Sequence, residues 1–131
     1  MVTGFDQHFA GLEITQAQFR VLLAVWKQGG ADGIAPSALA DYLLIERGTV
    51  SVLTTRMVTR GWLTRQPGEN RRTYRLTLTK AGTKLLQDVV PRALALAGHT
   101  LAGIPLDQLQ QMRASLGLIE TRLREYTPPQ E

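Results

Sequence analysis

Positively charged side chains are concentrated in one stretch of this 131-residue chain, between positions 46 and 80. The stretch holds eight basic residues and two acidic ones, so its net charge is +6, against +4 for the whole chain. The basic residues are Arg47, Arg56, Arg60, Arg65, Arg71, Arg72, Arg75 and Lys80, and the acidic ones are Glu46 and Glu69. Because clustered charge of one sign attracts a partner of the other, this pattern predicts a polyanion bound at this stretch. The alternative is a solvated surface that is merely rich in arginine.

The first part of the stretch has the pattern of a DNA-reading helix. A helix is predicted from about residue 47 to residue 60, with Val50, Leu53 and Met57 facing inward, and a shorter helix beginning near Pro36 precedes it. In such a helix-turn-helix the second helix can enter the major groove and reach base edges. Ser37, at the start of the first helix, is placed for a phosphate contact. The candidates for DNA contact in this part are Ser37, Arg47, Gly48, Thr49, Ser51, Val52, Thr55 and Arg56.

Individual side chains of the predicted reading helix suit particular contacts. Arg47 fits guanine, because its forked guanidinium matches the two acceptors of that base in the major groove. Val52 could touch a thymine methyl group, and Thr49 and Ser51 could bond phosphates or bases. For Thr49, Ser51 and Thr55 the alternative is simply an exposed helix position.

The second part of the stretch predicts a β-hairpin. Residues 62–66 and 73–78 are strand-like, and the four residues from Pro67 to Asn70 supply turn chemistry. Arg71 and Arg72 follow this turn, and a cationic finger of this kind can enter a narrow minor groove. The candidates for DNA contact in the hairpin are Arg65, Asn70, Arg71, Arg72 and Arg75, of which Arg65 and Arg75 are expected nearer the phosphates.

Other predicted elements must hold the helix-turn-helix and the hairpin in place. Thr15 and Gln18 predict a capping box at the start of a helix that ends near Trp26, with Phe19, Leu22, Leu23 and Trp26 on one buried face. A glycine-rich loop at 29–33 breaks this helix, Gly61 ends the reading helix, and Thr79 caps a long helix that ends near residue 100.

The predicted last helix, from about residue 106 to residue 126, has a heptad pattern. Its apolar residues alternate three and four apart, as in a coiled-coil seam, and the N-terminal segment adds further apolar residues. These residues are Leu109, Met112, Leu116, Ile119, Leu123 and Tyr126, together with Phe5, Phe9 and Leu12. They are predicted to form a homodimer interface, because the hairpin-bearing lobe already closes its own core. The alternative is a helix docked on that core.

These elements predict a mainly α fold with a small β-hairpin wing (α+β), in a single domain of residues 1–131. Within it, residues 15–82 form a winged helix-turn-helix lobe, residues 1–14 and 83–126 a helical dimerisation region, and residues 127–131 a flexible tail.

Composition excludes several other classes of protein. The 44% hydrophobic and 20% charged residues are typical of a soluble globular chain, and no apolar run approaches the roughly 18–20 residues that span a bilayer. With no signal peptide, we expect a cytoplasmic protein without membrane association. The absence of cysteine excludes disulfides and thiol redox sensing, and His8 and His99 lack ligand spacing, so neither a metal nor a cofactor is expected. No enzyme motif stands out.

Six segments together resemble the MarR family (multiple antibiotic resistance regulators) over roughly residues 12–126. They are LEITQAQFRVL at 12–22, ALADYL at 38–43, GTVS at 48–51, RGWLTR at 60–65, RR at 71–72 and LTKAG at 78–82. The resemblance implies an obligate dimer built from the terminal helices, with one winged helix-turn-helix in each subunit. It also implies a palindromic operator, and release by a small ligand held between the dimer layer and the DNA-binding lobes.

The chain departs from the family pattern at three positions. Asn70 stands where the family usually has an aspartate that steadies the wing arginine Arg72. Val52 occupies a position often held by arginine, and Glu46 a position where a serine-like cap is common.

We therefore expect a dimeric, sequence-specific, DNA-binding transcriptional regulator, a repressor of a palindromic operator that a small molecule relieves. Phe19, Trp26 and His99 are candidates for the ligand pocket, and they suit a core position equally well. The alternative is a winged-helix protein-interaction module, of the anti-repressor type, that does not read DNA sequence.

Overall fold

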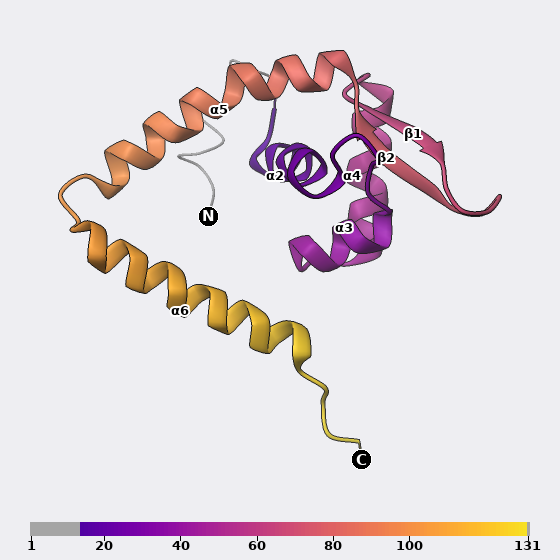
Figure 1. The fold of residues 1–131 in the computed structure, drawn as a ribbon. Helices are drawn as coiled ribbons and strands as arrows, with labels where there is room; N and C mark the ends of the chain where they lie inside the picture. Colours follow the sequence, from indigo (N-terminus) through magenta and orange to yellow (C-terminus); the bar gives the residue numbers. More distant parts are fainter. Residues whose placement is uncertain (1–13, 131) are drawn as a thin grey trace. The chain divides into compact units, whose positions relative to one another are not determined.

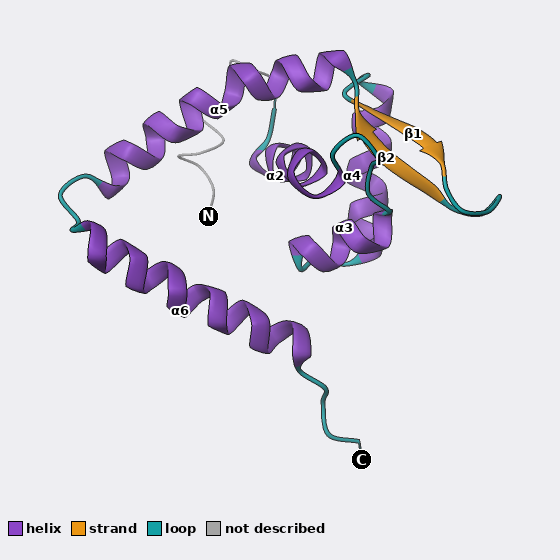
Figure 2. Ribbon diagram, viewed as in Figure 1, coloured by secondary structure: helices purple, strands orange, loops and turns teal. Residues whose placement is uncertain are grey.

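The computed structural model describes residues 14–130, and these residues divide into two compact units at Ala93. The predicted interface residues Phe5, Phe9 and Leu12 lie outside the described residues. The helices are α2 (Gln16–Ala24), continued by a π-helical turn η2 (Val25–Gly29), then α3 (Pro36–Leu43), α4 (Arg47–Thr59), α5 (Lys80–Leu101) and α6 (Leu106–Glu125). The strands are β1 (Leu63–Pro67) and β2 (Tyr74–Leu78), so the predicted fold class is confirmed (Figures 1 and 2).

Helix α2 begins as predicted and ends differently. The hydroxyl of Thr15 accepts from the backbone N–H of Gln18 at 3.2 Å, and the Gln18 amide oxygen accepts from the N–H of Thr15 at 3.1 Å, which confirms the capping box. The expected burial of Trp26 is wrong, since this side chain is 55% exposed. A π-helical turn begins at Val25, and a wider turn rotates the following residues away from the α-helical pattern. Val25 takes the core position instead.

The turn between α3 and α4 closes around a leucine in a left-handed conformation. Leu44 has φ of +56°, and the N–H groups of Leu44 and Ile45 donate to the carbonyls of Asp41 and Ala40 at 3.4 and 3.2 Å. This is the Schellman pattern of helix termination, which is usually built on glycine. Pro36 occupies the first turn of α3, as predicted.

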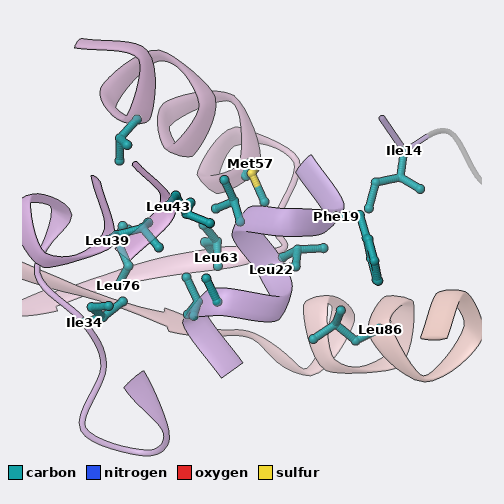
Figure 3. Close-up of a cluster of buried hydrophobic side chains, with 14 of the residues drawn as sticks. Ile14, Phe19, Leu22, Ile34, Leu39, Leu43, Met57, Leu63, Leu76 and Leu86 are labelled. Atoms are coloured by element: carbon teal, nitrogen blue, oxygen red, sulfur yellow. The ribbon is translucent and has the colours of Figure 1, made fainter. Parts of the chain in front are cut away.

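The core of the first unit lies where α2, α3, α4 and the hairpin meet (Figure 3). Leu22, Leu39, Met57 and Leu76 are all fully buried there. Helix α5 contributes Leu86 and Val89 to the same core, and Figure 3 shows Leu86 on the side where Ile14 and Phe19 lie. With these α5 residues included, the first compact unit extends to Ala93, and the predicted division of function after Gly82 stays a prediction.

The hairpin is antiparallel, with a register that runs from Leu63 opposite Leu78 to Pro67 opposite Tyr74. Ile34 pairs with Leu76 on the outer edge, through backbone hydrogen bonds of 3.0 and 2.8 Å. The base of the hairpin is thereby tied to the loop that precedes α3.

The second unit, from Leu94 onward, contains the end of α5 and all of α6. No residue of α6 is buried within the described chain. Within residues 14–130 no single helix is long and apolar enough to cross a membrane; only α5 and α6 taken together have the required length and composition.

The start of α5 allows no side chain at Gly82. The Thr79 hydroxyl accepts from the Gly82 N–H at 3.0 Å, and a Cβ at position 82 would lie 2.1 Å from the Trp62 carbonyl oxygen. We expect Gly82→Ala to lower the free energy of unfolding by about 2 kcal/mol or more, because backbone atoms must move to admit the methyl group. Denaturant unfolding measures this.

The matched control is Gly48→Ala, another glycine in a helix of the same unit. A Cβ at Gly48 meets nothing within 4 Å, so this change should be neutral or should stabilise by up to about 1 kcal/mol. Equal effects of the two substitutions would contradict the close approach at Gly82.

Candidate nucleic-acid interface

The outer face of α4 is a continuous exposed surface of the first unit. Val50, Thr54 and Met57 are fully buried, and Leu53 and Val58 are partly buried against the same core, so the opposite side of the helix is exposed. All of the predicted contact positions on this helix are exposed: Arg47, Gly48, Thr49, Ser51, Val52, Thr55 and Arg56. Sequence reasoning missed Thr54, whose hydroxyl is buried at low cost because it donates to the Val50 carbonyl at 2.8 Å.

The first turns of α3 and α4 lack side-chain caps. Neither Ala35, which precedes α3, nor Glu46, which precedes α4, accepts a hydrogen bond from its helix through its side chain. The N–H groups of a helix's first turn carry a partial positive charge and suit a phosphate oxygen. Ser37 is half-buried in the first turn of α3, and Arg47 is the first residue of α4.

The tip of the wing, residues 68–73, is organised by Asn70. The side-chain oxygen of Asn70 accepts from the backbone N–H of Arg72 at 2.9 Å. The backbone N–H of Asn70 donates to the Thr73 hydroxyl at 3.1 Å. The Asn70 carbonyl also accepts from the Thr73 N–H at 3.2 Å. Arg71 and Arg72 are exposed beside this turn. An asparagine thus fixes the backbone at Arg72 by itself, although it carries no charge to pair with the guanidinium.

Thr73 is a tip residue that the sequence reasoning missed. Its hydroxyl both accepts from Asn70 and donates to the Asn70 carbonyl at 3.2 Å. The spacing of an asparagine three residues before a threonine is a signal that could have found it, because both residue types form local side-chain-to-backbone hydrogen bonds in turns.

The two arginines on the wing strands donate hydrogen bonds to other residues of the protein. Arg65 donates from Nη2 to the Thr55 hydroxyl at 3.1 Å, and its guanidinium lies 5.2 Å from the centre of the Tyr74 ring. Arg75 is half-buried and donates from Nη1 to the Gly33 carbonyl at 3.2 Å. Phosphate contact by either residue stays a prediction.

The three predicted pocket residues do not come together in one unit. Phe19 is 8% exposed and belongs to the core, because it packs inside the first unit, while Trp26 faces outward. Trp26 lines an open hollow of about 500 Å³ with Gly30, Ala31, Gln66, Thr77, Leu78 and Thr83. His99 is exposed on the second unit. Within residues 14–130 no group of three histidine, aspartate or glutamate side chains is placed to hold a metal ion.

Two short helices joined by a tight turn, followed by a two-stranded hairpin with an arginine-bearing tip, define a winged helix-turn-helix protein. The sequence profile of the MarR family matches residues 12–72. A relative, the transcriptional regulator PecS of Dickeya dadantii, is 28% identical over 119 residues, covering 90% of this chain and 72% of PecS. Residues 12–72 therefore match the MarR family, and the chain is similar over most of its length to a transcriptional regulator of that kind.

Solved structures share the fold. A single-site mutant of Escherichia coli MarR, complexed with operator DNA, superposes with a TM-score of 0.76 at 23% identity, covering 87% of this chain and 81% of that one. CouR of Rhodococcus jostii, bound to p-coumaroyl-CoA, superposes with a TM-score of 0.78 at 21% identity, covering 95% and 84%. At these identities the likeness concerns the fold.

The hydrogen bond to the Arg72 N–H can be removed at Asn70. We expect Asn70→Ala to speed exchange of the Arg72 amide about three- to tenfold, because this N–H loses its acceptor. Amide hydrogen exchange followed by NMR measures this. Asn70→Asp keeps the acceptor and should preserve the slow exchange, as should the neighbouring change Glu69→Ala. Unchanged exchange in Asn70→Ala would show that the turn does not depend on this side chain.

Proposed function

We propose that the protein is a dimeric, sequence-specific DNA-binding repressor that a small molecule releases from a palindromic operator. The observation that carries this proposal is the exposed outer face of α4, with its uncapped start, within a segment of net charge +6. Side-chain forks and hydroxyls on such a face can meet base edges, and the wing tip adds two exposed cations. The chemistry is recognition and not catalysis, so we infer that the protein is not an enzyme.

The exposed side chains of α4 divide between reading and anchoring. Arg47, at the start of the helix, suits guanine, and Val52, which is 54% exposed, suits a thymine methyl group. Ser37 and the first N–H groups of α3 suit a phosphate. At the wing tip, Arg71 and Arg72 suit the minor groove, where the narrowed phosphate walls attract cations.

The apolar seam of α6 supports a dimer. On α6, Met112, Leu116, Ile119 and Leu123 are 45%, 64%, 53% and 60% exposed, and Tyr126, which follows the helix in an extended conformation, is 67% exposed. A row of large apolar side chains at heptad spacing is costly to leave in water and matches a second copy of the same helix. We infer that the terminal helices form the dimer layer, including the predicted contributions of Leu109, Phe5, Phe9 and Leu12.

Dimerism determines the form of the operator. A two-fold symmetric protein reads two equivalent half-sites, about one helical turn or roughly 34 Å apart, in successive major grooves. Such a dimer represses by occupying a site that transcription needs. The shared fold with E. coli MarR, whose structure contains operator DNA, supports this mode of binding.

Release by a small molecule requires a ligand that binds more tightly when the two subunits are spaced so that the dimer does not fit DNA. The shared fold with CouR, whose structure contains p-coumaroyl-CoA, supports a ligand-binding role for this architecture. Phe19, Trp26 and His99 stay the predicted lining. We infer a cytoplasmic site of action, where both the operator and such ligands are present.

A second candidate function is a protein-interaction module that does not read sequence. Val52 is an exposed apolar residue on the outer face of α4, and the Glu46 carboxylate precedes this helix without capping it. Both features suit a protein surface better than a phosphate backbone.

The experiment that separates the two is selection of genomic fragments by the purified protein, followed by salt titrations of the enriched DNA. A repressor enriches a palindrome. Arg72→Ala should then lower the salt slope by about 0.9 without changing the preferred sequence, because one phosphate-neutralising cation is lost. Arg47→Ala should instead relax the preference at one base pair, by about 1–3 kcal/mol.

Arg113→Ala, on α6 of the second unit, is the control for loss of a charge outside the winged helix-turn-helix, and it should change neither the salt slope nor the preferred sequence. If no fragment is enriched over random DNA, the repressor is the wrong function and the interaction module is favoured.

Ile119→Asp tests the dimer layer. We expect it to raise the dimer dissociation constant at least about a hundredfold, because an unpaired carboxylate would be buried at the interface in each subunit. Sedimentation equilibrium measures this. Ala114→Asp introduces the same charge on α6 outside the apolar seam and should leave the dimer intact. A monomeric native protein, or equal effects of both substitutions, would contradict an interface along this seam.

A further inference from the structure

We infer that Arg65 and Arg75 are positioning residues, which clamp the wing to α4 on one face and to the loop before α3 on the other. DNA contact by the wing is then made by its tip, and the angle between tip and reading helix is held by these two side chains. The inference deepens the proposed DNA binding and rests on it for its functional consequence.

The two arginines lie on opposite faces of the hairpin. In the antiparallel register Arg65 stands opposite Leu76, and Arg75 stands opposite Gln66. Cross-strand partners share a face, and successive residues of a strand alternate faces. Since Leu76 and Arg75 are successive, Arg65 and Arg75 project from different faces. Two ties from opposite faces oppose rotation of the hairpin in both directions.

Arg65 makes its tie to the reading helix. Its guanidinium donates to the Thr55 hydroxyl at 3.1 Å and lies 5.2 Å from the centre of the Tyr74 ring, on the neighbouring strand. The planar, always charged guanidinium can use its edge for the hydroxyl and its face for the ring, which an ammonium group cannot do. The tie joins the wing to a residue on the exposed face of α4, so the two elements that meet DNA are connected directly.

Arg75 makes its tie to the loop. It is half-buried and donates to the Gly33 carbonyl at 3.2 Å, next to the backbone pairing of Ile34 with Leu76. Gly33 has φ of +83°, and a Cβ there would lie 2.8 Å from Thr77 Cγ2 and 2.9 Å from the Leu76 carbonyl oxygen. The loop backbone therefore lies directly against β2, and the guanidinium closes this contact.

The charges of the wing are thus divided by position. Arg65, which is exposed, and Arg75, which is half-buried, both donate hydrogen bonds to other residues of the protein, and the exposed Arg71 and Arg72 lie at the tip, beside the turn that Asn70 forms. A wing clamped in this way presents its tip at a fixed angle to α4 without ordering the wing anew on each binding event, which lowers the entropic cost of binding.

The test of the Arg65 tie is a double-mutant cycle between Arg65→Met and Thr55→Val in the full-length protein. Without DNA, each substitution should speed exchange of the β1–β2 amides about threefold or more, and the double variant should exchange no faster than the single ones. With the selected operator, each should weaken binding about three- to tenfold, again without addition, and should leave the salt slope unchanged. Thr55→Ser keeps the hydroxyl and should show the native exchange of the β1–β2 amides.

Two results would overturn the Arg65 tie. One is native amide exchange in Thr55→Val. The other is a salt slope lowered by about 0.9 in Arg65→Met alone, which identifies a phosphate contact. Since the exchange arm needs no DNA, it tests the clamp even if no operator is found, so failure of the clamp and failure of the repressor function are distinguishable.

The Arg75 tie is tested in the same way. Arg75→Met should speed exchange of the Leu76 amide, which donates to the Ile34 carbonyl at 2.8 Å, while Arg71→Met at the tip should not. Equal exchange of the Leu76 amide in the two variants would overturn this half of the inference.

Discussion

The burial of one side of α4 determines which of its side chains face outward, where a partner can bind. Val50, Thr54 and Met57 are fully enclosed by α2, α3 and the hairpin, so rotation of the helix about its axis would expose two apolar side chains and a hydroxyl bonded to Val50. Burial of this kind stabilises by roughly 1.5–3 kcal/mol for each large apolar side chain. The orientation of the outer face, from Arg47 to Arg56, follows from this constraint.

The wing depends on the same core and on polar ties outside it. Leu63 and Leu76 anchor the base of the hairpin in the core, and Gly82 lets α5 begin directly against the Trp62 carbonyl. Toward the tip, hydrogen bonds from Asn70 within the turn and from Arg65 to α4 are added to the partial burial of Tyr74. The wing is thus held mainly by apolar packing at its base and mainly by hydrogen bonds at its tip.

The elements and several of their ends were predictable from the sequence. The capping box at Thr15, Pro36 in the first turn of α3 and the left-handed Gly61 are local signals, and the structure confirms each of them. The predicted exposure along α4 follows from the inward-facing positions of Val50, Leu53 and Met57. The burial of Trp26 was predicted wrongly, because a helical repeat read from sequence assumes an uninterrupted α-helix, and the π-helical turn at Val25 breaks it.

The sequence by itself determined the charge of the segment from Glu46 to Lys80, the order of its helices and strands, and the apolar repeat of α6, because these depend on residue types at short spacing. Only the tertiary structure decided what each wing arginine does. Arg65 and Thr55 are ten residues apart, and Arg75 and Gly33 are 42 residues apart, so no local pattern connects them. Which donor meets which acceptor depends on the register of the hairpin and on its docking against α4 and the loop, and the packed core sets both.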